Sequence, residues 1–143
     1  MHDINNNLIV IGYDEVYRST TGGASWDSIS YNASGGQAIR TIALAPSNED
    51  YIYAASYSKI KVTKDAGLNW TYIKPGLPNY NITDVAVSTN NADRAWVTFS
   101  DYNNIHKVYE TTDGGTNWIN ISGNNHPQHP VNCILYQGGT NDD

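Results

Sequence analysis

Sulfur, charge and long apolar stretches are all scarce in this chain of 143 residues. Cys133 is the only cysteine, so no disulfide can form within the chain. It lies in an apolar run, where we expect a small buried hydrophobe and not a catalytic thiol, because no activating histidine accompanies it. No stretch approaches the roughly 20 apolar residues of a membrane helix. Residues 1–7 also lack the basic and apolar regions of a signal peptide.

Charged residues make up only 15% of the sequence, and acidic ones dominate. The 14 acidic and 8 basic side chains give a net charge of -6, and lysine and arginine nowhere form a run. The resulting field repels nucleic acid and anionic membranes. We therefore expect neither a nucleic-acid partner nor membrane insertion.

Tyrosine, asparagine, threonine, serine and glycine are abundant, whereas leucine, lysine and glutamate are few. Aromatic and β-branched residues favour strands, and glycine and asparagine favour tight turns. The composition predicts an all-β protein with many short strands.

One eight-residue pattern that ends in tryptophan occurs three times. The copies are Ser19–Trp26, Thr63–Trp70 and Thr111–Trp118. Their tryptophans are 44 residues apart (70 − 26) and then 48 apart (118 − 70). Self-similarity at this period is the signature of a repeat fold, in which each unit buries its faces against its neighbours.

Each copy has the residues of a tight turn between two strands. Asp65 and Asp113 can accept hydrogen bonds from the backbone amides of their own turns. Gly67 and Gly115 can adopt a positive φ at little cost, and the tryptophans are large enough to fill the space between units. The residues assigned to this structural turn are Ser19, Gly23, Trp26, Thr63, Asp65, Gly67, Trp70, Thr111, Asp113, Gly115 and Trp118.

Apolar and alternating runs, separated by clusters of Pro, Gly and Asn, divide the chain into four-stranded units. Residues of about 8–34 supply three strands, about 35–78 and 79–124 supply four each, and about 131–136 read as the first strand of a next unit. We predict a single β-propeller segment over residues 1–143, with three blade equivalents made of four-stranded antiparallel sheets.

The pattern Ser/Thr-x-Asp-x-Gly-x-Thr/Ser/Asn-Trp resembles the Asp-box, or BNR repeat. It is similar to repeats of bacterial sialidases, sortilin-type receptors, xyloglucan-degrading hydrolases and a photosystem assembly factor. Thr21 stands where the aspartate belongs in the first copy, so we expect that turn to be weaker. The resemblance implies a structural turn far from the ligand-binding face. It also implies an extracellular or cell-surface protein.

Three blades cannot close a ring, because propellers typically need four to eight. Either a second copy of the chain completes a six-bladed ring, or the remaining blades belong to a longer parent chain. In the first case, residues 131–136 of one copy would pair beside residues 8–11 of the other.

The residues favour a protein without enzymatic activity. Sialidases use three arginines to hold a carboxylate, but Arg18, Arg40 and Arg94 occupy non-equivalent positions of the repeat. His126 and His129 have a spacing that metal sites use on helices, which the neighbouring prolines forbid. We assign no catalytic residue, metal ligand or cofactor.

Loop and channel side chains are the candidate ligand-binding residues. Aromatic loop residues can stack on sugars or anchor a protein partner. Asp84 and Arg40 lie at nearly equivalent places in first strands, which line a propeller channel, and can form an ion pair there. Alternatively, Asp84 is a strand-end carboxylate bonded to a neighbouring loop. The candidates are Tyr13, Tyr57, Tyr80, Tyr102, Arg40 and Asp84.

Three functional hypotheses remain. The first is a non-enzymatic binding or scaffold module of a secreted or cell-surface protein, which recognises a glycan or a protein through propeller loops. The second is part of an Asp-box glycoside hydrolase, sialidase-like or xyloglucanase-like, which needs two carboxylates across a sugar. The third is a purely structural repeat that assembles with itself.

Overall fold

The computed structural model describes residues 7–29, 36–102 and 106–138, and these form three antiparallel sheets without a helix. Blade 1 contains β1 (Ile9–Gly12), β2 (Val16–Ser19) and β3 (Asp27–Ser28). Blade 2 contains β4 (Thr41–Leu44), β5 (Ile52–Ala55), β6 (Ile60–Thr63) and β7 (Thr71–Tyr72). Blade 3 contains β8 (Asn81–Val87), β9 (Ala95–Ser100), β10 (Val108–Thr111) and β11 (Ile119–Asn120). The all-β expectation is confirmed.

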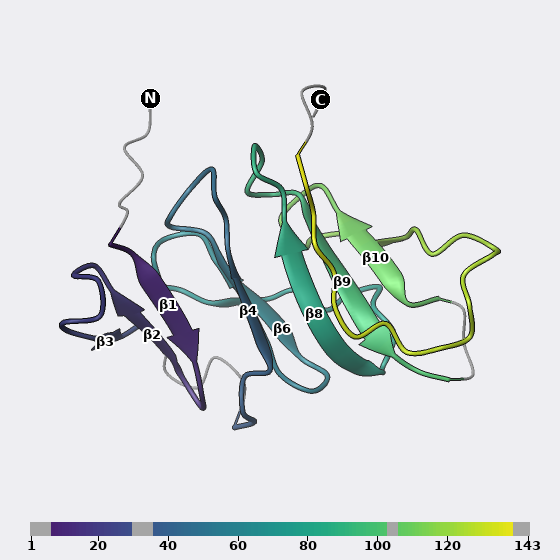
Figure 1. Ribbon diagram of the computed structural model, residues 1–143, viewed down its shortest axis with the longest axis horizontal. Coiled ribbons are helices and arrows are strands. Elements are labelled where there is room, and N and C mark those ends of the chain that lie inside the picture. The colour runs from purple at the N-terminus through teal and green to yellow at the C-terminus, as the bar shows by residue number, and fades with distance from the viewer. Residues whose placement is uncertain (1–6, 30–35, 103–105, 139–143) are drawn as a thin grey trace.

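Strand order follows chain order in every sheet, so each blade is a simple antiparallel meander. The blades lie side by side as a fan, with β1, β4 and β8 in succession (Figure 1), and β4 packs against both of the others. The blades also share one register, because Ser19, Thr63 and Thr111 each pair with the start of the preceding strand. This is the arrangement of part of a β-propeller.

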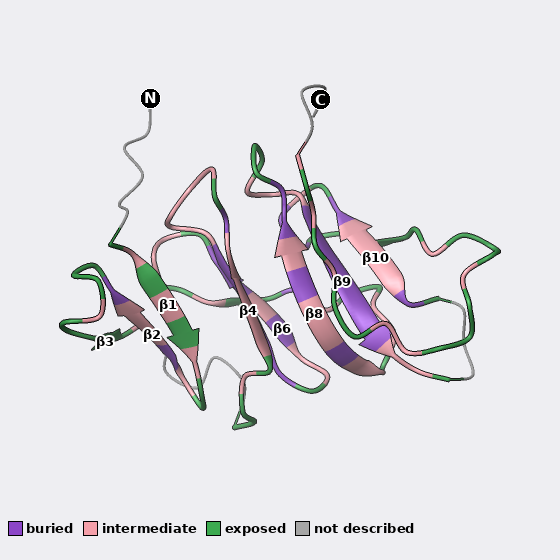
Figure 2. Ribbon diagram, in the orientation of Figure 1, coloured by how far each residue is buried: buried purple, intermediate pink, exposed green. Residues whose placement is uncertain are grey.

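Burial follows a strand's place in the fan. All of β5 is buried, and so is β9 up to its last residue, because neighbouring blades cover both faces. The main core lies between blades 2 and 3 and includes Tyr53, Val62, Val97 and Phe99. In contrast, Ile9 and Ile11 of β1 are 40% and 45% exposed, as Figure 2 shows for this strand at one end of the fan.

Residues 131–136 cross blade 3 in extended form but make no strand, so the expected first strand of a next blade is not formed. The Thr83 hydroxyl donates to the Val131 carbonyl (2.6 Å), and the Ile134 amide donates to an Asp84 oxygen (3.1 Å). A first strand needs the second strand of its own blade for a ladder, and none of the described strands pairs with this segment. For the same reason Cys133, expected to be buried, is exposed.

Two successive residues with positive φ shape each repeated turn. The pairs are Gly22 and Gly23, Ala66 and Gly67, and Gly114 and Gly115, with φ between 58° and 98°. The first amide of each pair donates to a carbonyl in the loop before the second strand of its blade, at 3.0, 3.0 and 2.8 Å. Ala66 is the one described non-glycine residue with a positive φ, and it occupies a position where the other copies have glycine.

Replacing Ala66 with glycine is expected to stabilise the protein. The left-handed conformation costs an L-residue about 1 kcal/mol or more, and part of this gain is lost to the larger backbone entropy of glycine in the unfolded chain. The net increase should be about 0.5 kcal/mol, visible as a higher melting temperature by circular dichroism. Ala24→Gly is the control: Ala24 has no positive φ, so this change should slightly destabilise the protein. An Ala66→Gly protein that melts no higher than wild type would contradict the argument.

Candidate functional site

The repeated turns are held by a carboxylate at their centre. In the second copy, Asp65 Oδ1 accepts hydrogen bonds from the Thr63 hydroxyl and the Asn69 amide, both at 2.8 Å. Its Oδ2 accepts a bond from the Asn69 side-chain amide at 2.7 Å. Asp113 repeats this set with Thr111 and Asn117 at 2.8, 2.8 and 2.7 Å. Each box carboxylate thus has both oxygens engaged within its own turn.

These bonds favour the charged carboxylates. The side chain and then the backbone amide of Asn69 lower the pKa of Asp65. For Asp113, the backbone amide of Asn117, followed by its side chain, lowers the pKa. A hydrogen bond donated to an ionised carboxylate stabilises that form, so both box aspartates are stabilising at neutral pH.

The first copy replaces the carboxylate with a single hydroxyl oxygen. Thr21 Oγ1 accepts the Ser25 amide at 2.9 Å, which is the bond that Asp65 makes with the Asn69 amide. Ser19 Oγ still accepts the Gly23 amide at 2.9 Å. The turn therefore keeps its shape with one fewer acceptor, and its lower stability stays a prediction.

A joint between blades is built on the glycine and tryptophan of each box. Trp70 Nε1 donates to the carbonyl of Ile29, which follows the last strand of blade 1, at 2.9 Å. Trp118 Nε1 donates in the same way to Ile73 of blade 2 at 2.7 Å. A Cβ placed on Gly67 would lie 2.5 Å from Ile29 Cβ, so glycine is required for this approach. The prediction that these two tryptophans fill the space between blades is confirmed.

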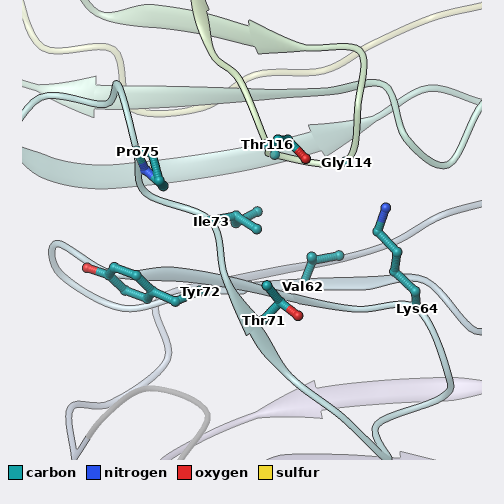
Figure 3. Close-up of a pocket in the computed structure, with 9 residues that line it drawn as sticks. Val62, Lys64, Thr71, Tyr72, Ile73, Pro75, Gly114 and Thr116 are labelled. Carbon is teal, nitrogen blue, oxygen red and sulfur yellow. The ribbon is translucent and has the colours of Figure 1, made fainter.

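The partner isoleucines are the part of the joint that sequence reasoning missed. Ile29 and Ile73 each lie three residues after a box tryptophan. Figure 3 shows Ile73 pointing toward the third box, in a crevice of about 260 Å³ between blades 2 and 3. Their signal was the same three-residue offset in every copy, since Ile121 follows Trp118 likewise.

The candidate tyrosines lie at the opposite end of the strands from the boxes. The boxes follow β2, β6 and β10, whereas Tyr13, Tyr57 and Tyr102 follow β1, β5 and β9, in the loops that lead into β2, β6 and β10. Antiparallel pairing places these two sets of loops at opposite rims. The three side chains are 73%, 51% and 68% exposed. We call this rim, with Arg40 at the start of β4, the tyrosine rim.

Tyr80 lies at the same rim, just before β8, but differs from the other three. Its side chain is only partly exposed and packs against the core between blades 2 and 3. The backbone near it is tied to blade 2, because the Ile82 amide donates to the Tyr57 carbonyl at 2.8 Å. Tyr80 therefore supports the rim from below.

Arg40 and Tyr57 border an open depression on the tyrosine rim. The Arg40 guanidinium lies 5.8 Å from the centre of the Tyr57 ring, a cation–π distance. Gln37 and Ala38 complete the lining of the depression, whose volume is about 640 Å³. It offers a cation, an amide and an aromatic ring to a ligand.

The expected ion pair between Arg40 and Asp84 is not present among the described residues. By register it is Thr41 that is equivalent to Asp84, and Arg40 is equivalent to Thr83. Neighbouring strand residues point to opposite faces of a sheet. A one-residue offset therefore sends Arg40 to Tyr57 and leaves Asp84 to other partners.

Asp84 links three segments that are distant in sequence. Its Oδ1 accepts the Thr41 hydroxyl at 2.7 Å and the Val85 amide at 2.9 Å. Its Oδ2 accepts the Ile134 amide at 3.1 Å. The alternative interpretation, a carboxylate bonded to a neighbouring segment, describes this geometry, and it ties β4, β8 and the C-terminal segment together.

No helix of the described residues is long and apolar enough to cross a membrane. The same part of the chain brings no three or more histidine, cysteine or acidic side chains together as a metal site. His129 contributes its backbone carbonyl to Lys107 Nζ at 2.7 Å, and His126 Nδ1 contacts the carbonyl of Pro127.

A family model described as Sortilin, neurotensin receptor 3, matches residues 14–132. The chain belongs to the Sortilin-Vps10 family. Among curated proteins, none matches this Sortilin-Vps10 chain in sequence.

Solved structures show the same fold. An ancestral GH74 enzyme aligns with a TM-score of 0.69 and 17% identity over 96% of this Sortilin-Vps10 chain and 20% of its own. The GH74 enzyme of Niastella koreensis gives 0.65 and 17% over 94% and 21%. A structure of YCF48 bound to D1 peptide gives 0.57 and 17% over 77% and 35%. The chain thus spans about a fifth to a third of these structures, and identities this low establish the propeller fold alone.

Replacing Asp113 with asparagine is expected to lower the melting temperature at pH 7 and to matter less in acid. A carboxyl group whose pKa is lowered by folding stabilises the native state above its ordinary value near 4. That contribution is lost as the pH falls through the folded-state pKa. Thermal melts at pH 7 and about pH 3 should therefore show the gap between wild type and Asp113→Asn shrinking.

Asp27→Asn provides a control with the same change of charge, because Asp27 is an exposed residue of β3 outside the box. This variant is expected to show a smaller gap at pH 7. A gap of equal size at both pH values, or one matched by the control, would refute the stabilising role of the Asp113 charge.

Proposed function

We propose that this chain is a non-enzymatic binding module that recognises an extended peptide segment of a protein through its tyrosine rim. The observation that carries the proposal is the repetition of exposed tyrosine rings, one in the same inter-strand loop of each blade, on the rim opposite the structural turns. Tyrosine supplies a large contact area at low conformational cost, which suits it to recognition surfaces.

The chemistry of the rim suits a peptide that lies across several loops. The depression beside Arg40 presents a cation for a carboxylate, and Gln37 can exchange hydrogen bonds with a peptide backbone. The Tyr57 ring can pack against an apolar side chain next to it. Family membership adds support, since its description names a neurotensin receptor, and the YCF48 neighbour is described as bound to a peptide.

A glycan is the second candidate ligand, because exposed aromatic rings also stack on sugars and two GH74 enzymes share the fold. Glycoside hydrolysis is the less favoured alternative, since Asp84 already holds three donors with its two oxygens. We further propose an extracellular or cell-surface location, supported by membership of the Sortilin-Vps10 family.

The test is selection of peptides from a random phage-displayed library on the immobilised chain. Tyr57→Ala is expected to reduce capture of the selected peptides about tenfold or more, because it removes a central aromatic contact. Tyr72→Ala is the matched control: Tyr72 is 47% exposed, compared with 51% for Tyr57, but lies on the outer strand β7 away from the rim.

A parallel panel of xyloglucan oligosaccharides separates the alternatives. Retention of sugars in place of peptides, sensitive to Tyr57→Ala, would replace the peptide with a glycan ligand. Release of smaller sugars would favour a hydrolase. Equal loss of peptide capture in both tyrosine variants, or none in either, would overturn the role of the tyrosine rim.

A further inference from the structure

One edge of blade 1 lacks the strand that the other blades have. β1 is equivalent to β5 and β9, each of which is flanked by strands on both sides, whereas β1 pairs only with β2. Its Ile9 and Ile11 are 40% and 45% exposed. An apolar edge strand without a partner is an invitation to pair with another chain.

The missing strand has a counterpart at the other end of the fan. Residues 131–136 align with residues 39–44, which enter and form β4, and with residues 82–87 of β8. The Val131 amide donates to the Phe99 carbonyl of blade 3 (3.4 Å), as the Ile39 amide donates to the equivalent Tyr13 carbonyl of blade 1. Tyr136 stacks on Trp96 with ring centroids 4.2 Å apart. The segment is therefore docked where the first strand of a following blade belongs.

The side chains of this segment alternate as a strand's would. Ile134 and Tyr136 are partly covered by blade 3, while Cys133 and Leu135 are exposed, Leu135 at 92%. Leu135 aligns with Ala43 of β4, and Ala43 packs toward the next blade. The exposed face of 131–136 thus points to where a further blade would lie.

The two halves of a third joint are also present and unmatched. Ile121 stands where Ile29 and Ile73 stand in blades 1 and 2, and it is 44% exposed. At the other end, Trp26 is 39% exposed, whereas Trp118 in the joint between blades 2 and 3 is only 8% exposed. Gly23, the glycine of the same box, has no isoleucine of a preceding blade within 4 Å. The two observed joints show what each half accepts.

We propose that a second copy of this chain covers both ends, so that two chains form one closed six-bladed ring. Ile121 of each copy fills the site at Gly23 and Trp26 of the other, and residues 131–136 pair with the free edge of β1. With three blades per chain, two copies give six, and three copies would give nine, beyond the usual range of about four to eight. The association is head-to-tail and closes by a two-fold axis.

The register of the new pairing follows from the repeat. Thr41 pairs with Ala55 in blade 2, and Gly12 is the equivalent of Ala55 because it pairs with Val16 as Ala55 pairs with Ile60. Cys133 therefore lies opposite Gly12 of the second copy, and Leu135 opposite Val10. Val10 packs in the cluster between blades 1 and 2, so Leu135 enters that apolar cluster.

The first test is the absolute mass of the full chain by light scattering behind a sizing column. The expected mass is twice 15.8 kDa. Ile121→Asp would bury a charge at both joints and should weaken dimerisation about tenfold or more, with the circular dichroism spectrum unchanged. Leu68→Asp is the control, because Leu68 is 85% exposed on blade 2 and should leave the dimer intact.

A designed disulfide tests the register. Paired residues of antiparallel strands have Cα atoms about 4.5–5.5 Å apart, within the range that a disulfide spans. With Cys133→Ser removing the native thiol, Val10→Cys combined with Leu135→Cys should give a covalent dimer on oxidation. Val10→Cys combined with Leu68→Cys should not.

A monomer at all concentrations would overturn the second copy as the occupant of these ends. A series of larger species that grows with concentration would overturn the closed ring. A dimer unaffected by Ile121→Asp, or one that the Val10/Leu135 pair fails to cross-link, would overturn the proposed contacts.

Discussion

The joint between neighbouring blades is the constraint on which the structure depends. A small twisted sheet has two apolar faces and no interior of its own, so it is stable only against another sheet. Here the box tryptophan of one blade donates to an isoleucine carbonyl of the blade before it, at 2.9 Å and 2.7 Å. The hydrogen bond satisfies both polar groups where water is excluded, so it fixes the spacing of the blades as well as their packing.

Glycine in the box answers two demands at one position. Gly67 has a φ of 98°, which few side chains tolerate. It is also approached by Ile29 so closely that any Cβ would clash. A residue that met the backbone demand alone, such as the alanine accepted at position 66, would block the neighbouring blade. The turn and the joint are therefore a single device, in which Asp65 sets the backbone and the backbone admits the isoleucine.

The repeat made most of the fold predictable. Strand positions agree closely with expectation, because three aligned copies give the same segmentation three times. The partners of the joint were not predictable in the same way, since a pattern in one copy does not say which residue of the preceding copy it meets. The Arg40–Asp84 ion pair failed for a related reason: an error of one residue in register reverses the face to which a side chain points. The extended segment at 131–136 was recognised by its pattern, but a pattern cannot supply the hydrogen-bonding edge that makes a strand.

The separation of the two rims follows from the same architecture. Carboxylates of the boxes serve their own turns, and the strands hold these turns away from the tyrosine rim. The loops of the tyrosine rim carry no such network, so their side chains can vary while the blades remain fixed. The spacing between Tyr13, Tyr57 and Tyr102 is then set by the angle between blades, which the joints determine. A ligand that spans two loops would read that angle, so recognition at one rim depends on isoleucine, glycine and tryptophan contacts made toward the other.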